Sequence, residues 1–198
     1  ARYRLEIRGR AAHAGQNPEA GRSAVIELAA KILSLDGLND RAAGTTISVG
    51  VISGGTLVNV IPDFSSAQID CRFLTPEAYS TLRKGIEGIV AVPHVPDTSA
   101  RLEETAFLPP LEATPQNRAL LGLVLNAAAE LGLDPGHTVS GGFSDGNFVS
   151  ALGVPVMDGM GPVGGNFHAE DEYVEIATLA ERSALLALSI ARVLGDDS

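Results

Sequence analysis

The stretch "SSAQIDCRFLTPEAYSTLRKGIEGIVA" at residues 65–91 joins a strand signal directly to a helix signal. Its first ten residues predict a strand, and the helix signal begins at the next position. Thr75 can cap a helix, Pro76 suits the first helical position, and Glu77 adds an acid to the first turn. The sequence therefore predicts a strand over 65–74 that runs straight into a helix over 75–91.

Working outward, the neighbouring segments extend this pattern into one unit. Residues 2–10 alternate apolar and polar side chains, as in a half-buried strand, and residues 22–35 repeat apolar side chains at helical spacing. Further strands are predicted at 45–55 and, more weakly, at 98–105. The order β-α-β-β-α-β is that of a ferredoxin-like fold, complete within roughly 105 residues.

Three prolines in "FLPPLEATPQ" (107–116) mark a boundary, so we expect one domain over 1–108 and a second segment over 109–198. The second segment predicts helices near 116–131, 145–152 and 175–194, with strands near 137–140 and 154–158. This alternation is typical of an α/β sheet domain. Because two strands would leave a sheet edge unpaired, the segment is interpreted as the C-terminal tail of an α/β domain whose beginning lies outside this chain.

Composition excludes several classes of protein. Fourteen basic and 24 acidic side chains give a net charge of −10, which argues against nucleic-acid binding. With no apolar run near 18 residues, no membrane span is expected. Neither the start at Ala1 nor the residues after it indicate a signal peptide. The single cysteine, Cys71, favours an intracellular, cytoplasmic protein and is interpreted as a buried strand residue rather than a nucleophile.

The glycines of "GMGPVGGNFHAEDEY" (159–173) spell G-x-G-x-x-G, the outline of a dinucleotide-binding loop. Such a loop requires a helix directly after it, because the pyrophosphate sits on the helix N-terminus. Here Pro162 interrupts the loop, and no helical spacing begins before Ile176. We therefore interpret these residues as a glycine-rich turn.

A second outline, G-x-S-x-G, lies in "GGFSDG" (141–146), and Ser144, Asp158 and His168 follow the order of a hydrolase triad. A serine hydrolase therefore stays open as an alternative function. Against it, the acid and the histidine would both lie within 24 residues of the serine, where that fold normally inserts several elements. Ser144 can equally cap a helix or form a turn.

His168 is also a candidate metal ligand. The acids Glu170, Asp171 and Glu172 follow it and could orient its ring, or simply form a solvated turn. One imidazole does not make a site, since zinc needs three or four ligands.

Four motifs, in this order, resemble the zinc-dependent metallopeptidase family of glutamate carboxypeptidase, acetylornithine deacetylase and succinyl-diaminopimelate desuccinylase. They are "GRAAHAGQNPEAGRSAV" (9–25), "GGTLVNVIPD" (54–63), "IDCRF" (69–73) and "GGFSDGNFVSALGVPVMDGMGPVGGNFHAEDEYV" (141–174). The last is closest to the glutamate carboxypeptidase branch. The resemblance implies a ferredoxin-like lid, which also makes a homodimer, inserted into a catalytic α/β domain that binds two zinc ions.

Residue by residue, the resemblance implies that His168 is a ligand to one zinc. It implies that His13 reaches into the partner subunit's active site and steadies the oxyanion of the tetrahedral intermediate. Asn59 and Arg72 are similar to the groups that grip a substrate carboxylate, and Gly142 to a backbone contact with substrate. The implied substrate is a peptide or N-acyl amino acid, cleaved at an amide bond next to a free carboxylate.

The chain departs from the family pattern in its other metal ligands. The family's His-x-Asp motif, bridging aspartate and Glu-Glu pair belong to an N-terminal half, and no His-x-Asp occurs in these 198 residues. We therefore expect a fragment that is inactive alone, without a complete zinc site. A non-enzymatic dimerisation or binding module is the other alternative.

Overall fold

The computed structural model describes residues 1–195. The chain divides into two compact units, Ala1–Pro110 and a second that begins at Leu111. Over the described range, none of the helices combines the length and the apolar character needed to cross a membrane.

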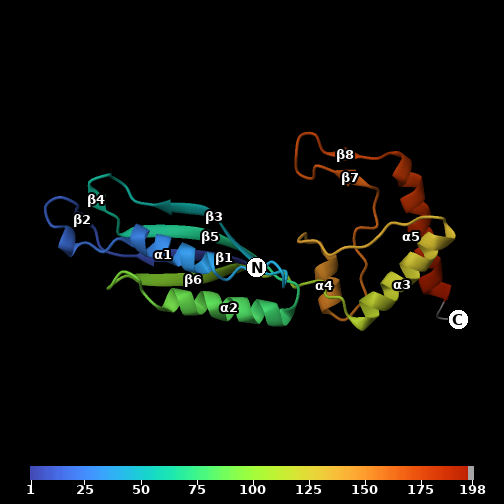
Figure 1. Ribbon diagram of the computed structural model, residues 1–198, viewed down its shortest axis with the longest axis horizontal. Coiled ribbons are helices and arrows are strands. Elements are labelled where there is room, and N and C mark those ends of the chain that lie inside the picture. The colour runs from blue at the N-terminus through green and yellow to red at the C-terminus, as the bar shows by residue number, and fades with distance from the viewer. Residues whose placement is uncertain (196–198) are drawn as a thin grey trace. The chain divides into compact units, whose positions relative to one another are not determined.

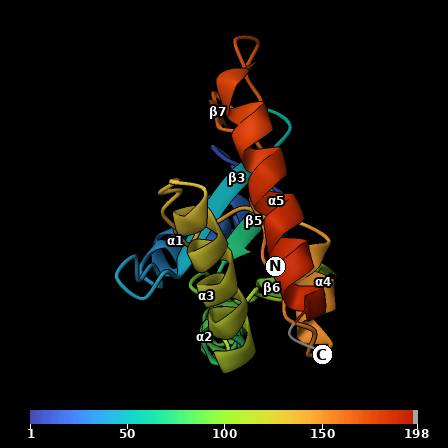
Figure 2. The same cartoon turned by 90° about the vertical axis from the view of Figure 1, so that its right-hand side faces the viewer.

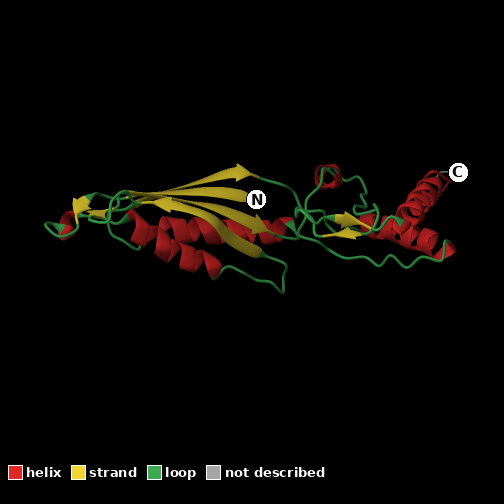
Figure 3. Cartoon of the chain, turned by 90° about the horizontal axis from the view of Figure 1, so that it is seen from above, coloured by secondary structure: helices red, strands yellow, loops and turns green. Residues whose placement is uncertain are grey.

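The first unit is a four-stranded antiparallel sheet with two helices on one face (Figures 1 and 3). The strands lie in the order β3-β5-β1-β6, with bounds β1 Arg2–Arg8, β3 Thr46–Gly54, β5 Phe64–Arg72 and β6 Ser99–Ala106. The helices are α1, Ala24–Asp36, and α2, Pro76–Ala91. This is the predicted ferredoxin-like order, so the predicted fold of this unit is confirmed.

Alternation along the strands builds the core of the first unit. On β1 every second residue is buried against the helices, and β5 repeats the pattern in register with it. The helices add apolar side chains to the same layer. The largest apolar side chains of this core that are fully buried are Leu5, Ile7, Leu35, Ile69 and Ile86.

Local capping explains where the two helices begin. The Ser23 hydroxyl accepts a hydrogen bond from the backbone N–H of Ile26 at the start of α1. The Thr75 hydroxyl accepts one from the N–H of Ala78 at the start of α2, and Pro76 takes the first helical position. The predicted cap at Thr75 is thus confirmed.

A short strand pair that the sequence did not predict lies at one end of the sheet (Figure 1). Strand β2, Ala12–His13, pairs antiparallel with β4, Val60–Ile61. A 3-10 turn, Pro18–Ala20, follows β2. Two-residue strands carry no periodic signal, so only the surrounding sheet reveals them.

The second unit contains three helices and one small strand pair. Its elements are α3 Pro115–Glu130, α4 Gly146–Ala151, β7 Gly164–Gly165, β8 Tyr173–Val174 and α5 Ala177–Gly195. Helices α3 and α5 pack together (Figure 2), and an ion pair between Arg192 and Glu130 joins them. The three predicted helices are confirmed.

The strands predicted at 137–140 and 154–158 are wrong, because neither segment is a strand in the structure. A strand exists only when a neighbouring strand pairs with its backbone. At 154–158 the N–H of Val156 instead donates to the side-chain oxygen of Asn117, 2.9 Å away. The glycine-rich turn leads into the β7–β8 pair and not into a helix. This agrees with the interpretation of residues 159–173 as a turn and not as a dinucleotide-binding loop.

Candidate functional site

His13 ends strand β2, and a tight loop holds its polar groups. Its backbone N–H donates to Asn17 Oδ1 (3.2 Å), and its ring nitrogen Nδ1 accepts a hydrogen bond from the N–H of Gly15 (3.1 Å). The side chain is exposed. A fixed backbone under an accessible imidazole suits a group that contacts a ligand.

Asn59 lies close to His13 along the chain segments that the β2–β4 pair joins, although the two are 46 positions apart in the sequence. The β2–β4 pair sets His13 opposite Val60, and the carbonyl oxygen of Asn59 accepts a hydrogen bond from the N–H of Ala14 (2.9 Å). Asn59 is exposed as well. The structure therefore brings these two predicted site residues together.

Arg72 lies at the opposite end of the sheet. It ends β5, in register with Thr46 of β3, and its guanidinium contacts the Asp70 carboxylate at 2.7 and 3.3 Å. From Phe64 to Arg72, eight steps of about 3.3 Å make roughly 26 Å. Within one chain, Arg72 is thus separated from Asn59 and His13.

Gly142 lies in an exposed loop before α4, where its N–H donates to Ser140 Oγ (3.1 Å). Next to it, the Ser144 hydroxyl bonds the Asp158 carboxylate and accepts a hydrogen bond from the N–H of Gly146 (3.2 Å). The hydrogen bond from the Ser144 hydroxyl and, second, the one from the N–H of Gly159 lower the pKa of the Asp158 carboxyl group. A catalytic triad sets an imidazole between serine and acid, and here serine contacts the acid directly.

His168 lies in the turn between β7 and β8, with an exposed side chain. Its backbone is left-handed (φ 67°), as is that of Asn166 (φ 57°). The Asn166 amide donates to the carboxylate of Asp171 (2.8 Å), which closes the turn around His168. Asp171 is therefore a turn-forming residue.

The described residues do not by themselves fit a two-zinc site. Within residues 1–195, no three His, Cys, Asp or Glu side chains gather closely enough to hold a metal ion. His168 is a single candidate ligand, whereas a catalytic zinc takes three from the protein. Residues outside the described part would have to supply the others.

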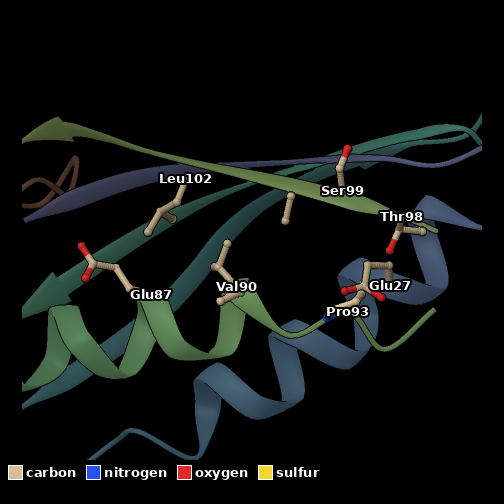
Figure 4. Close-up of a pocket in the computed structure, with 9 residues that line it drawn as sticks. Glu27, Glu87, Val90, Pro93, Thr98, Ser99 and Leu102 are labelled. Carbon is tan, nitrogen blue, oxygen red and sulfur yellow. The ribbon is translucent and has the colours of Figure 1, made fainter. Parts of the chain in front are cut away.

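A pocket among the described residues lies elsewhere, between α2, β6 and the start of α1 (Figure 4). Glu27 lines it, and its carboxylate accepts hydrogen bonds from the N–H groups of His94 and Val95 at 2.8 and 2.6 Å. The carboxylate also contacts the ammonium of Lys31 at 2.9 Å, and the two side chains are 1% and 3% exposed.

Burial opposes ionisation of Glu27, but the hydrogen bonds from Val95 and His94 and the charge of Lys31 outweigh it and lower its pKa. Lys31 in turn donates to the carbonyl oxygens of Ile89 and Val92, at the end of α2. The pair holds α1 to the end of α2 and to the segment that follows it. We therefore assign this pocket a structural role.

Cys71 is buried on β5, as predicted. Burial raises the pKa of its thiol to about 12, so it stays protonated at neutral pH and is a poor nucleophile.

Sequence reasoning missed Asn17 and Arg22 beside the candidate site. The Asn17 side chain accepts a hydrogen bond from the backbone N–H of His13. The Arg22 guanidinium donates to two backbone carbonyl oxygens at the far end of the loop that follows His13. The only sequence signal was an amide four residues after a histidine, which is too common to be specific.

Comparison with known proteins identifies the first unit. Residues 1–98 match the model of the peptidase dimerisation domain. Carboxypeptidase G2 of Pseudomonas sp. (strain RS-16) is 25% identical over 185 residues, which cover 92% of this chain and 45% of that protein. A succinyl-diaminopimelate desuccinylase of Methylococcus capsulatus is 31% identical over 163 residues, 81% of this chain and 41% of that protein.

Solved structures share the fold. A tripeptidase of Staphylococcus aureus aligns over 97% of this chain and 50% of its own, with a TM-score of 0.74 and 23% identity. A Bacillus subtilis protein described as a dinuclear metal binding peptidase from the M20 family aligns over 98% and 50%, with a TM-score of 0.67 and 22% identity. The chain spans about half the length of the curated relatives it matches. It belongs to the M20 peptidase family, with carboxypeptidase G2 and succinyl-diaminopimelate desuccinylase among its relatives.

Proposed function

We propose that the whole protein is a dinuclear zinc hydrolase, a carboxypeptidase or N-acyl-amino-acid amidohydrolase that cleaves an amide bond next to a free carboxylate. One observation carries the proposal: in a chain of this family, the β2–β4 pair brings the backbone at His13 close to the segment that holds Asn59, so two motif residues far apart in the sequence lie at the same end of the sheet. The exposed imidazole and the exposed carboxamide can each donate a hydrogen bond to a carbonyl or carboxylate oxygen.

In this proposal His168 is one of the zinc ligands, and Gly142 gives a backbone contact to the substrate. Arg72 and Asn59 bind the substrate carboxylate, for which a planar guanidinium is well shaped. His13 donates a hydrogen bond to the oxygen that becomes negative during attack on the amide. The remaining metal ligands lie outside the described residues, so the chain by itself is inactive.

We also propose that two copies pair along β3, one of the two edge strands of the first unit's sheet. Beside its free edge, Val51 and Ile52 are 52% and 60% exposed, and Ile26 and Leu33 of α1 are 54% and 77% exposed. An unpaired edge next to apolar side chains is a ready template for strand pairing. A two-fold axis makes such a contact self-complementary.

If the β3 strands of two copies pair antiparallel, opposite ends of the two sheets lie next to each other. Gly54 of one copy then lies near Thr46 of the other, so His13 and Asn59 approach the end of the partner that carries Arg72. The strand β6 also ends there, since Ala106 pairs with Arg2, and the chain continues into its second unit. This arrangement supports a site that takes His13 and Asn59 from one subunit and Arg72 from the other.

The first test is metal content and hydrolysis in the whole protein, with N-acyl glutamates and N-succinyl amino acids as substrates. We expect His168→Ala to lose bound zinc and activity together. His137→Ala, a matched control at another exposed loop histidine, should retain both. A wild-type protein without zinc, or a His168→Ala variant with full zinc content, would refute the proposal.

The second test mixes inactive variants. We expect His13→Ala to keep its zinc and lose about a hundred- to a thousandfold in kcat. Equal mixing of His13→Ala and His168→Ala subunits should restore about a quarter of wild-type activity, because half of the dimers then contain one intact composite site. If His13 served its own subunit, the mixture would stay inactive.

A further inference from the structure

The loop that follows His13 closes back onto that residue. The carbonyl oxygen of His13 accepts hydrogen bonds from the N–H groups of Gln16 (3.3 Å) and Asn17 (3.2 Å), while its own N–H donates to Asn17 Oδ1 (3.2 Å). Asn17 thus contacts both polar groups of the His13 backbone. The hydrogen bonds of the loop therefore converge on a single residue, His13.

The same loop engages one nitrogen of the imidazole. The N–H of Gly15 donates to Nδ1 at 3.1 Å, so Nδ1 must present a lone pair. A neutral imidazole carries one proton, and that proton then lies on Nε2. The ring is left with an N–H donor on its far nitrogen, and the side chain is exposed.

The Asn17 side chain bonds His13 in place of the capping hydrogen bond that is usual at its position. It precedes the 3-10 turn Pro18–Ala20, where an asparagine normally bonds the N–H groups of the turn, yet its side chain makes no such bond. Its side-chain oxygen is used on His13 instead. The sequence places an amide here, and the structure uses it on the residue four positions earlier.

Arg22 connects the far end of the loop to the rest of the unit. Its guanidinium donates to the carbonyl oxygens of Glu19 (2.9 Å) and Gly21 (2.8 Å) and pairs with Asp97 at 3.1 Å. Its backbone pairs with Arg10 through two hydrogen bonds of 2.9 Å. The loop is therefore held at both of its ends, by β2 and by Arg22.

We propose that Asn17 and the backbone N–H of Gly15 are positioning groups that hold the His13 ring as its Nε2–H tautomer, with that N–H as a donor for a ligand. The inference rests on the proposed function, in which His13 donates to the oxygen of the scissile amide. It adds that the donor is a neutral imidazole of fixed tautomer, set by residues that do not touch the substrate.

The structural test uses nitrogen-15-labelled histidine in this chain at about pH 8, where an ordinary imidazole is neutral. Spectra that correlate ring nitrogens with ring protons should show His13 with Nδ1 unprotonated and Nε2 protonated. In Asn17→Ala we expect a tautomer mixture and an exchange of the Gly15 amide faster by about tenfold. A protonated Nδ1 in the wild type, or an unchanged Gly15 amide in Asn17→Ala, would overturn the inference.

The functional test uses the whole dimeric enzyme. We expect Asn17→Ala to lower kcat about tenfold with KM changed less than about twofold, because a misaligned donor weakens transition-state binding more than substrate binding. Asn17→Asp, whose carboxylate accepts the same bond, should recover kcat to within about twofold. Gln16→Ala is the control, since it changes a neighbouring side chain of the same loop and should keep wild-type activity.

The structural test and the functional test together distinguish the positioning role of Asn17 from the proposed function of His13. If His13→Ala retained full activity while Asn17→Ala altered the tautomer, the proposed function would fail and the positioning role would stand. If Asn17→Ala left both the tautomer and kcat unchanged while His13→Ala was inactive, the positioning role alone would fail.

Discussion

The two units of the chain differ in how they cover the apolar faces of their helices. In the first unit, α1 and α2 lie on a four-stranded sheet and share a continuous core with it. In the second, the described core consists of Val124, Ala127, Ala128 and Leu185 with a few partly buried neighbours. Helix α5 leaves Leu179, Leu186, Ile190 and Val193 between 42% and 50% exposed.

This difference shows how a sheet covers the apolar face of a helix of modest amphipathicity. A helix buries one stripe of side chains, and a flat sheet face covers that stripe along its length. Two crossing helices cover each other only where they meet, so the rest of the α5 stripe lacks a partner among the described residues. We expect the first unit to be the more stable one.

The largest expected effect breaks the buried ion pair of the first unit. Glu27→Gln should lower the free energy of unfolding of that unit by about 3–5 kcal/mol, because it leaves the Lys31 ammonium buried without its counter-charge. Hydrogen exchange measured along the chain would localise the loss. Equal loss of protection in α3 and α5 would show that the two units unfold together and do not differ in stability.

The same residue gives a pH dependence with a definite sign. The pKa of Glu27 is lower in the folded state than in the unfolded one, so its contribution is present at neutral pH. It is lost as the pH falls below the ordinary glutamate value of about 4.3 and through the lower folded pKa. Acid destabilisation of the first unit should therefore be weaker in Glu27→Gln than in Glu87→Gln, a control whose side chain is half exposed.

A leucine-to-alanine pair compares the two units directly. Leu5→Ala, in the core of the first unit, should cost about 2–5 kcal/mol through lost burial and the cavity left behind. Leu186→Ala, on the exposed face of α5, should change stability by less than about 0.5 kcal/mol. Urea unfolding followed by circular dichroism and hydrogen exchange would measure both. A similar cost at the two positions would mean that the α5 stripe is covered in solution.

The smallest effect compares two helix caps of the same type. Thr75 and Thr114 each precede a proline and accept a hydrogen bond from the third residue beyond them, at the start of α2 and α3. Replacing either with alanine should cost about 1 kcal/mol. Thr75→Ala should lower the stability of the whole first unit, whereas Thr114→Ala should speed exchange mainly within α3. Global destabilisation by both would join the two units into one cooperative body.

The sequence predicted the first unit well because each of its elements has a local signal. Alternation at Tyr3, Leu5 and Ile7 marks the buried face of β1, and "TPE" at 75–77 marks the start of α2. The strand predicted at 154–158 failed because an apolar run specifies a strand only if a partner strand pairs with it. There the Asn117 side chain bonds Val156 instead.

The candidate site could be predicted only as separate residues. The resemblance selected His13 and Asn59, but their proximity depends on a pair of two-residue strands that no local pattern reveals. The separation of Arg72 from both follows from the register of β5, which pairing with β1 and β3 determines. Spatial relations of this kind arise from the assembled sheet.

The pairing of β5 on both sides also limits how the distance between the two ends of the sheet can evolve. A one-residue insertion in β5 would turn every later side chain to the opposite face and expose the apolar row that includes Ala67, Ile69 and Cys71. Two-residue insertions, matched in β1 and β3, preserve the pleat. Each such insertion lengthens the reach from Asn59 to Arg72 by about 6.6 Å, a coarse step next to the dimensions of an amino acid. Relatives that acquire new substrates are expected to change side chains at the ends of the sheet and to keep its length.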